Sequence, residues 1–483
     1  MKKLMMSLAL PALLMGCSED KKPQKPSSFS EQMAGLIWND QTLENVIAVK
    51  NYEGEALAGA QILIGTALDA PFAGNFLTAD ENGLVEIPAE WTSAQAITVQ
   101  AEGYMRLTYL NQEPGAMTLR LRVQPAKIQH EVTGTTPNLP IQHKDGWTDF
   151  GLVMPAFSKL DMLSFSMDRV ISPQTDRITP LGQQIDVPSN IALPEQEEKF
   201  GIFTVKLDKP VYRIYYGNPG VNRVFAARGR FPFRSTVDHL RAGKAFYELI
   251  NDFKIHGGAI RDLDIKSTQT KIDLPTNEFT FAEPKVFVAP AVKHDEIFIA
   301  VSVANQSGYL IPTDFKKIPQ FDKVQLDTLP GAEALALGVL KKSEEMKNGG
   351  DRMSASLVPF VSGATPTMLP MIPDPTIAGD DIVMPKFNAA PSINPIATYS
   401  VLSKEEEVQQ GNAKVKIQNP QWEIYANTWL ERMTVPRWPT DKPVAGKKRW
   451  AVSFVGSQTA SQAPVGPAMI EAATHVTHST VTF

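Results

Sequence analysis

The chain has a single cysteine, Cys17, among its 483 residues, so no disulfide can form within it and its stability must come from packing. It has no Gly-x-Ser-x-Gly nucleophile elbow and no Gly-x-x-x-x-Gly-Lys phosphate loop. The sequence therefore carries no signature of a serine hydrolase of that kind or of a phosphate-loop enzyme. After residue 16, no apolar run approaches the roughly 20 residues that a membrane-spanning helix needs.

The charge balance is mildly acidic, with 52 Asp and Glu against 47 Lys and Arg. Surfaces that bind nucleic acid are basic, so this balance argues against nucleic acid as a partner and against peripheral binding to anionic lipid. Proline is abundant, at 37 residues in a chain where about 5% is the average. Prolines spread in this way cut a chain into short extended segments rather than long helices. The length of the chain suggests two to four domains, so a mainly β protein of several domains is predicted.

The first 17 residues have the pattern of an export signal. Two lysines precede the apolar run Leu4–Met15, which is too short to span a bilayer. The run ends in Leu14-Met15-Gly16-Cys17, and this ending resembles the bacterial lipoprotein signal. The resemblance implies cleavage before Cys17, lipidation of its thiol and acylation of the new amino terminus. An ordinary secretory signal that happens to end near a cysteine is the alternative.

A lipidated Cys17 would be a durable membrane anchor, because two or more acyl chains hold a protein stably to a bilayer. Ser18 is not the aspartate that, in the family's sorting rule, retains lipoproteins at an inner membrane. The resemblance therefore implies a lipid anchor in the outer membrane, on the periplasmic face or at the cell surface. Residues 17–42, rich in lysine, proline and serine, are expected to form a flexible tether.

Residues 43–124 alternate short apolar strands with polar turns. The turn Asp80-Glu81-Asn82-Gly83 ends in two residues suited to positive φ and precedes a returning strand. With Leu57-Ala58-Gly59-Ala60 and Ala101-Glu102-Gly103-Tyr104, the region resembles the carboxypeptidase regulatory-like, transthyretin-type β-sandwich family. The resemblance implies an immunoglobulin- or transthyretin-like sandwich nearest the lipid, with a spacer or interaction role and no catalytic residues.

Residues 125–275 are expected to form a larger β-rich domain with one helix. Strand patterns recur in this region, one of them near Leu160–Phe165. An amphipathic helix is predicted over residues 235–254, because Ser235 can cap it and an apolar stripe marks one face. Gly257-Gly258 would end this helix.

Residues 276–483 are expected to form a β-rich C-terminal region, with one or two further sandwich-like domains. Lys341–Arg352 has the composition of a hairpin loop, and the proline-rich Ser362–Pro395 that of a linker or a long covering loop. Four apolar runs share one texture at irregular spacing, which argues against a repeat protein. They are Phe298–Ala304, Ala334–Leu340, Ala397–Ser403 and Trp450–Gly456.

Paired carboxylates are the catalytic groups that the sequence leaves open, because a glycosidase needs only two of them across a cleft. Asp262 and Asp264 would share one side of a strand, and Asp161 and Asp168 lie in a β-rich region. With 52 acidic residues such pairs also arise by chance, so no catalytic residue is assigned.

No metal or other cofactor is predicted. Only His475 and His478 among the seven histidines are close, and residues three apart in a strand point to opposite faces. Both are expected to be exposed terminal residues. Asp80, Asn82 and Gly83 faintly resemble a calcium loop but lack its later ligands, so a hairpin turn explains them better.

Aromatic residues gather near the C-terminus, where arginines are also frequent. The group suits recognition of glycans or proteins through an exposed patch. Aromatic residues are also common in β-sandwich cores, and core packing is the preferred interpretation. The residues of the possible patch are Trp422, Tyr425, Trp429 and Trp438.

The leading hypothesis is a non-catalytic cell-envelope lipoprotein that acts as an interaction, adhesion or scaffold protein. Its expected partners are the membrane, through the lipid anchor, and envelope proteins or glycans. Two alternatives stay open: a glycan- or peptidoglycan-processing enzyme with unidentified carboxylates, and an accessory lipoprotein of an export or surface-assembly machine. An enzyme predicts a deep cleft with two convergent carboxylates, whereas a binding module predicts an exposed aromatic or apolar patch.

Overall fold

A computed structural model describes the chain from residue 45 to residue 483, apart from short gaps. The gaps are residues 68–75, 125–127, 141–145, 164–169, 173, 180–183, 201–202, 217–219, 243–247, 267–269, 307, 319–321, 349–351, 385, 411–412, 440 and 442–446. The predicted export signal, Cys17 and the tether therefore lie outside the described residues. Within the described part of the chain, no helix is long and apolar enough to cross a membrane.

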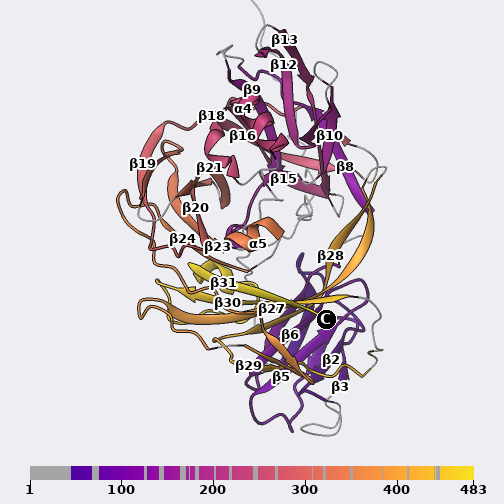
Figure 1. Ribbon diagram of the computed structural model, residues 1–483. Helices are drawn as coiled ribbons and strands as arrows, with labels where there is room; N and C mark the ends of the chain where they lie inside the picture. Colours follow the sequence, from indigo (N-terminus) through magenta and orange to yellow (C-terminus); the bar gives the residue numbers. More distant parts are fainter. Residues whose placement is uncertain are drawn as a thin grey trace, which may run out of the picture.

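The described chain consists mainly of β-strands in several sheets, which confirms the predicted fold class. In Figure 1 a six-stranded sheet lies at one end of the molecule and the first strands of the chain lie at the other. Strands from the C-terminal region lie between these ends. Buried and more exposed side chains alternate along β14 (Val211–Tyr216), whereas β9 (Thr148–Pro155) is buried along nearly its whole length.

The N-terminal region forms two sheets that pack face to face. One sheet has the order β4-β1-β7, and the strands of the other have the order β6-β5-β2-β3. Side chains from both sheets, among them Ile47 and Ile62, belong to one buried apolar cluster. The strands are β1 (Val46–Asn51), β2 (Gln61–Ile64), β3 (Phe76–Thr78), β4 (Leu84–Glu86), β5 (Gln95–Gln100), β6 (Arg106–Gln112) and β7 (Met117–Leu121).

The turn around Asp80 links the two sheets of this region. The Asp80 carboxylate accepts backbone hydrogen bonds from Asn82 at 2.9 Å and Leu84 at 2.8 Å. Gly83 has the predicted positive φ, +71°, and a Cβ there would overlap the carbonyl oxygen of Val49. Because β3 and β4 pair in different sheets, the turn crosses between sheets, and the predicted hairpin was wrong. Its side-chain contacts are those of a structural turn.

The C-terminal strands extend the sheet that contains β6. The long strand β28 (Ala413–Ala426) pairs in parallel with β6, with Trp422 opposite Arg106 and Tyr425 opposite Tyr109. The result is one sheet of 15 strands, which holds all four of the similar apolar runs seen in the sequence. From β28 outward the order is β27 (Asn394–Gln410), β30 (Lys448–Ser457), β31 (His475–Thr482), β24 (Met353–Pro359), β23 (Glu333–Lys342), β20 (Glu296–Gln306) and β21 (Tyr309–Ile318).

The hairpin of β27 and β28 also reaches the other end of the molecule (Figure 1). Near the end of β27, Gln409 pairs with Ile128 of β8, and β8 in turn pairs with β14 and β17. Beside them lies the six-stranded sheet, with the order β13-β12-β9-β15-β16-β18. These strands are β8 (Ile128–Thr135), β9 (Thr148–Pro155), β12 (Ile191–Phe200), β13 (Phe203–Lys209), β14 (Val211–Tyr216), β15 (Gly220–Phe231), β16 (Lys254–Ile265), β17 (Thr270–Lys271) and β18 (Phe279–Thr280).

Shorter elements complete the described fold. The strands among them are β10 (Thr175–Ile178), β11 (Ile185–Pro188), β19 (Glu283–Val288), β22 (Lys323–Thr328), β25 (Thr376–Ala378), β26 (Asp381–Val383) and β29 (Arg432–Thr434). The helical segments are α2 (Lys159–Leu163), α4 (Phe233–Arg241), η3 (Ile250–Asp252), α5 (Ser343–Asn348) and α6 (Met469–Ala472). Helix α5 lies in the connection between the paired strands β23 and β24, which confirms the hairpin predicted around Lys341–Arg352.

The helix predicted over residues 235–254 was wrong in its extent. Helix α4 covers only Phe233–Arg241, and η3 and the start of β16 occupy the end of the predicted range. Gly257 and Gly258 lie inside β16, where they end no helix. A Cβ on Gly257 would overlap the carbonyl oxygen of Phe279 in the neighbouring strand, so close packing within the sheet explains a glycine here.

The strand predicted near Leu160–Phe165 was also wrong, because helix α2 covers the described part of that range. The Ser158 hydroxyl and backbone N–H both donate to the Asp161 carboxylate, at 2.8 and 3.0 Å, and the Asp161 N–H donates back to the hydroxyl at 3.2 Å. This reciprocal arrangement stabilises a helix N-terminus. Asp161 is thus a buried structural residue, and Asp168, with which it was paired as a catalytic candidate, lies outside the described residues.

Candidate functional site

Asp262 and Asp264, the other carboxylates nominated from the sequence, lie on one side of β16, as predicted. That side is exposed, and each carboxylate has a cationic partner. Arg223 bonds to both oxygens of Asp262, at 2.5 and 2.8 Å, while Asp264 pairs with Lys266. The hydrogen bond from Arg223 lowers the pKa of Asp262. Both carboxylates are therefore engaged in surface ion pairs on the exposed face of β16.

His475 is fully buried, so the expectation that it is an exposed terminal residue was wrong. It lies in β31, which has β24 on one side and β30 on the other in the long sheet. Its Nδ1 lies 2.7 Å from the Thr474 hydroxyl, and its Nε2 lies 3.0 Å from the carbonyl oxygen of Thr367. A carbonyl oxygen only accepts, so Nε2 carries the proton of the neutral ring. Burial lowers the pKa of His475 to about 4.

His478 makes a different contact, as the alternation along β31 predicts. Its Nδ1 lies 2.8 Å from the hydroxyl of Ser453 in β30. The two histidines therefore have separate partners. Across the described ranges, no group of three or more His, Cys, Asp or Glu side chains is arranged to hold a metal ion.

The four aromatic residues suggested as a binding patch are packed in the interior. Trp422, Tyr425 and Trp438 are buried, and Trp429 is half-buried with its indole N–H bonded to a backbone carbonyl oxygen. Tyr425 packs edge-on against Tyr109 of the N-terminal region. These residues form no exposed patch, and part of the group fills the junction between β28 and β6.

The Arg106 side chain of β6 is sandwiched at this junction. Its guanidinium carbon lies 4.5 Å from the ring centre of Trp422 and 5.0 Å from that of Trp438. Two of its nitrogens bond to the two oxygens of Asp441, at 2.7 and 2.6 Å. The Trp422 indole N–H also donates to the Thr108 hydroxyl at 2.9 Å. Cation–π contacts and hydrogen bonds thus join chain segments about 300 residues apart.

A buried ion pair adds a second polar contact at the same junction. Arg122 follows β7, and its Nη2 lies 2.8 Å from Glu423 Oε1 in β28. The Tyr399 hydroxyl donates to the same oxygen at 2.7 Å. Burial and the adjacent Glu423 carboxylate both raise the pKa of Tyr399 well above its ordinary value, so its hydroxyl keeps the proton that it donates.

The proline-rich region predicted as a linker or covering loop lies over the long sheet. We call its central part, Thr367–Pro375, the covering segment. Leu369 and Ile372 of this segment are buried, with 0% and 1% of their surface exposed. Ile372 belongs to the apolar cluster that also contains Trp422, on one face of the sheet. The prolines of the covering segment prevent it from pairing as a strand, so burial of its apolar side chains holds it against the sheet.

Strand β31 holds the covering segment at three points. His475, Thr477 and Ser479 are alternate residues, so their side chains point to one face of the sheet. His475 bonds to the start of the segment, as described above. The Thr477 hydroxyl donates to the carbonyl oxygen of Pro370 at 2.8 Å, and the Ser479 hydroxyl donates to the Asp374 carboxylate at 2.7 Å.

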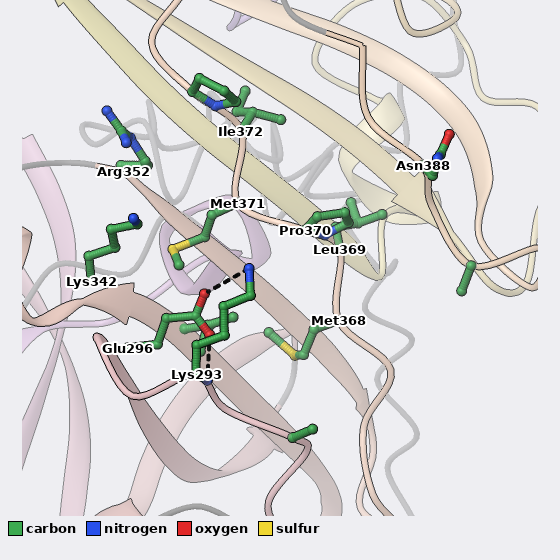
Figure 2. Close-up of a pocket in the computed structure, with 14 residues that line it drawn as sticks. Lys293, Glu296, Lys342, Arg352, Met368, Leu369, Pro370, Met371, Ile372 and Asn388 are labelled. Carbon is green, nitrogen blue, oxygen red and sulfur yellow. Dashed lines mark hydrogen bonds and ion pairs between the residues drawn. The ribbon is translucent and has the colours of Figure 1, made fainter.

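A pocket of about 450 Å³ lies between the covering segment and strands β20 and β23 (Figure 2). Its size is within the range of small-molecule sites. The lining combines methionine, leucine, isoleucine and proline side chains with charged groups. The lining residues are Ala291, Lys293, Glu296, Leu340, Lys342, Arg352, Met368, Leu369, Pro370, Met371, Ile372, Pro373, Asn388 and Ala390.

Lys293 and Glu296 lie between Met371 and Met368 in Figure 2. The Glu296 side chain is only 6% exposed, and its carboxylate accepts the Lys293 backbone N–H at 2.9 Å. The Lys293 side chain is 82% exposed, and its ammonium lies 3.7 Å from the other carboxylate oxygen. That separation exceeds a hydrogen-bond distance, so the ammonium is loosely held. The pocket thus contains the buried Glu296 carboxylate, which already accepts a hydrogen bond, beside the exposed Lys293 ammonium, which can bind a ligand.

The remaining two cations of the lining have partners outside it. Lys342 pairs with Asp295 at 3.1 Å, and both side chains are about half exposed. Arg352 is held more firmly, because Asp374 of the covering segment accepts from it at 2.6 Å. The lining itself therefore contributes three cations and one carboxylate.

The pocket was not predicted from the sequence. Its residues come from three separate stretches, around residues 291–296, 340–352 and 368–390. One signal was visible: Met368, Pro370, Met371 and Pro373 alternate bulky flexible side chains with residues that cannot join a ladder. Asp161, Asp262 and Asp264, the described members of the carboxylate pairs nominated from the sequence, do not line this pocket.

Comparisons with known proteins give no family for this chain. No family model and no curated protein matches it. One solved structure, "The Bacillus anthracis TIE protein", is similar at 10% identity with a TM-score of 0.16, over 66% of this chain and 48% of that one. The match thus spans about half of that protein's length. A fimbrial assembly protein from Parabacteroides distasonis is similar at 8% identity with a TM-score of 0.13, over 70% of this chain and 98% of that one.

Proposed function

We propose that this chain is a non-catalytic lipoprotein of the cell envelope, anchored in the outer membrane through Cys17, that acts as an interaction, adhesion or scaffold protein. Its sandwich nearest the anchor is proposed to be of the carboxypeptidase regulatory-like type. The sequence Leu14-Met15-Gly16-Cys17 supports the anchor. The pocket under the covering segment supports a binding role.

The observation that carries the scaffold role is the junction between β6 and β28. A spacer domain joined only by a linker would move independently of the domains that follow. Here the N-terminal strands pair with C-terminal strands through backbone hydrogen bonds, and the Arg122–Glu423 pair is buried beside them. An anchor before residue 43 would therefore hold the long sheet and its pocket through a continuous hydrogen-bonded frame.

The experiment compares the wild-type chain with Cys17→Ser in cell fractionation, with Ser28→Ala in the proposed tether as the matched control. The wild-type and Ser28→Ala chains are expected in the outer-membrane fraction, while Cys17→Ser is expected to leave it and to keep the uncleaved signal. Crosslinking of intact and permeabilised cells then identifies neighbours. Cys17→Ser in the outer-membrane fraction, at the size of the wild-type chain, would contradict the anchor, and the absence of any crosslinked envelope partner would contradict the interaction role.

A further inference from the structure

We propose that the pocket under the covering segment binds a small amphipathic carboxylate, with its anionic head at Lys293 and Lys342 and its apolar body against Met368 and Met371. This inference rests on the proposed function, because it names the ligand class of the pocket that supports it.

The lysines that line the pocket, Lys293 and Lys342, favour a ligand with an anionic head. Glu296 offers little to a ligand, because it is 6% exposed and already accepts a backbone hydrogen bond. The Lys293 ammonium is 82% exposed and has only a 3.7 Å contact with Glu296. Lys342 is the cross-strand partner of Glu296, and its pair with Asp295 is an exposed one. Exposed ion pairs contribute little to stability, so a ligand carboxylate can replace Asp295 as the partner of Lys342 at a small cost in free energy.

The apolar part of the lining suits a flexible hydrocarbon body. Met368 and Met371 are half-buried, and they lie on either side of the Lys293–Glu296 pair in Figure 2. Methionine side chains are unbranched and adapt to irregular apolar shapes. Leu340 and Ile372 add buried apolar surface to the lining. A ligand with an apolar chain would therefore replace water against these side chains.

The backbone around the pocket does not favour an extended peptide. Strand β23 pairs with β20 on one side and with β24 on the other, so it offers no open edge for an added strand. In the covering segment, Pro370 and Pro373 have no backbone N–H. The carbonyl oxygen of Pro370 already accepts from Thr477. Recognition must therefore come from side chains, which fits a small ligand better than strand addition.

The test measures binding of decanoate by isothermal titration calorimetry to residues 17–483 carrying Cys17→Ser, which lack the proposed signal, isolated without detergent. Decyltrimethylammonium, with the same apolar chain and the opposite charge, is the comparison probe. Decanoate is expected to bind at one site per chain and at least about tenfold more tightly than the cationic probe. Equal affinities, binding at many sites, or no binding of decanoate would each overturn the ligand class.

A charge reversal then tests the position of the head. Lys293→Glu is expected to weaken decanoate binding about tenfold or more and to strengthen binding of decyltrimethylammonium. Lys386→Glu is the matched control, because Lys386 is 79% exposed and pairs with Glu431 at 2.9 Å outside the pocket lining. A misfolded variant would lose both probes, so only the reversed preference supports the site. Unchanged preference in Lys293→Glu would overturn it.

The two proposals fail separately. Loss of decanoate binding overturns the ligand class but leaves fractionation and crosslinking as they were. Failure of Cys17→Ser to leave the outer-membrane fraction overturns the anchor but leaves the affinity of the pocket unchanged.

Discussion

The junction between the N-terminal strands and β28 can be tested by the substitution Glu423→Gln. Glutamine keeps the shape of the side chain but removes the charge that compensates Arg122. The pair is deeply placed, with 13% of the Arg122 side chain and 3% of the Glu423 side chain exposed. Removing one partner of a buried ion pair costs about 3–5 kcal/mol, because the other charge stays buried without compensation.

The cost converts into a shift in melting temperature. An unfolding entropy of about 2.1 cal/mol/K per residue, applied to residues 45–483 as one cooperative unit, gives about 0.9 kcal/mol/K. Glu423→Gln is therefore expected to lower Tm by about 3–5 °C. Differential scanning calorimetry at pH 7 measures the shift and also reports whether the body unfolds in one transition. A separate early transition of the N-terminal strands would contradict a continuous frame.

Two control variants separate burial from charge. Glu405 pairs with Lys416 across the same hairpin at 2.8 Å but lies at its exposed surface, so Glu405→Gln is expected to leave Tm unchanged. The double variant Arg122→Met with Glu423→Gln is expected to recover most of the loss, because no uncompensated charge remains. Equal melting temperatures for Glu423→Gln and Glu405→Gln would refute the reasoning.

Three further predictions concern stability and the covering segment. Burial lowers the pKa of His475 from 6.5 to about 4, so its contribution to stability is full above pH 6.5 and is lost as the pH falls toward 4. His475→Gln should therefore lose less stability than the wild-type chain between thermal melts at pH 7 and at pH 4.5. An unchanged pH dependence would count against this reasoning. Thr477→Val should speed amide hydrogen exchange across the covering segment about tenfold or more, because the hydroxyl that bonds to Pro370 is lost. The control Thr480→Val should not change the exchange rate. Equal rates in the two variants would show that the Thr477 hydroxyl does not hold the segment. Gly134→Ala should lower the free energy of unfolding in urea by about 1–3 kcal/mol or more, because its Cβ would overlap the carbonyl oxygen of Ile272. A Cβ at Gly115 would meet no neighbour, so Gly115→Ala is the control. Equal urea midpoints for the two variants would contradict this contact.

Short-range patterns in the sequence predicted many strands of the fold. The short runs Gln61–Ile64 and Val211–Tyr216 were predicted as strands, and the structure has strands with those bounds. The same approach failed where two local signals competed. The apolar stripe after Ser235 suggested a long helix, yet Gly257 and Gly258 serve the close approach of neighbouring strands. A glycine pair does not by itself distinguish a helix end from a tightly packed sheet.

Long-range pairing could not be predicted from these patterns. Trp422 and Arg106 are far apart in the sequence, and nothing in either strand specifies a parallel register with the other. The environment of His475 was missed for the same reason. A position near the chain end suggested exposure, but β31 inserts between β24 and β30, so the residue is buried.

The lipid anchor is the claim on which the proposed function depends most directly. Mass spectrometry of the N-terminal peptide from chain purified out of outer membranes tests it. The account predicts a mature chain that begins at Cys17 and carries the added mass of a thioether-linked diacylglyceryl group and an amide-linked acyl chain. A peptide that begins at Met1, or one that contains an unmodified Cys17, would contradict it.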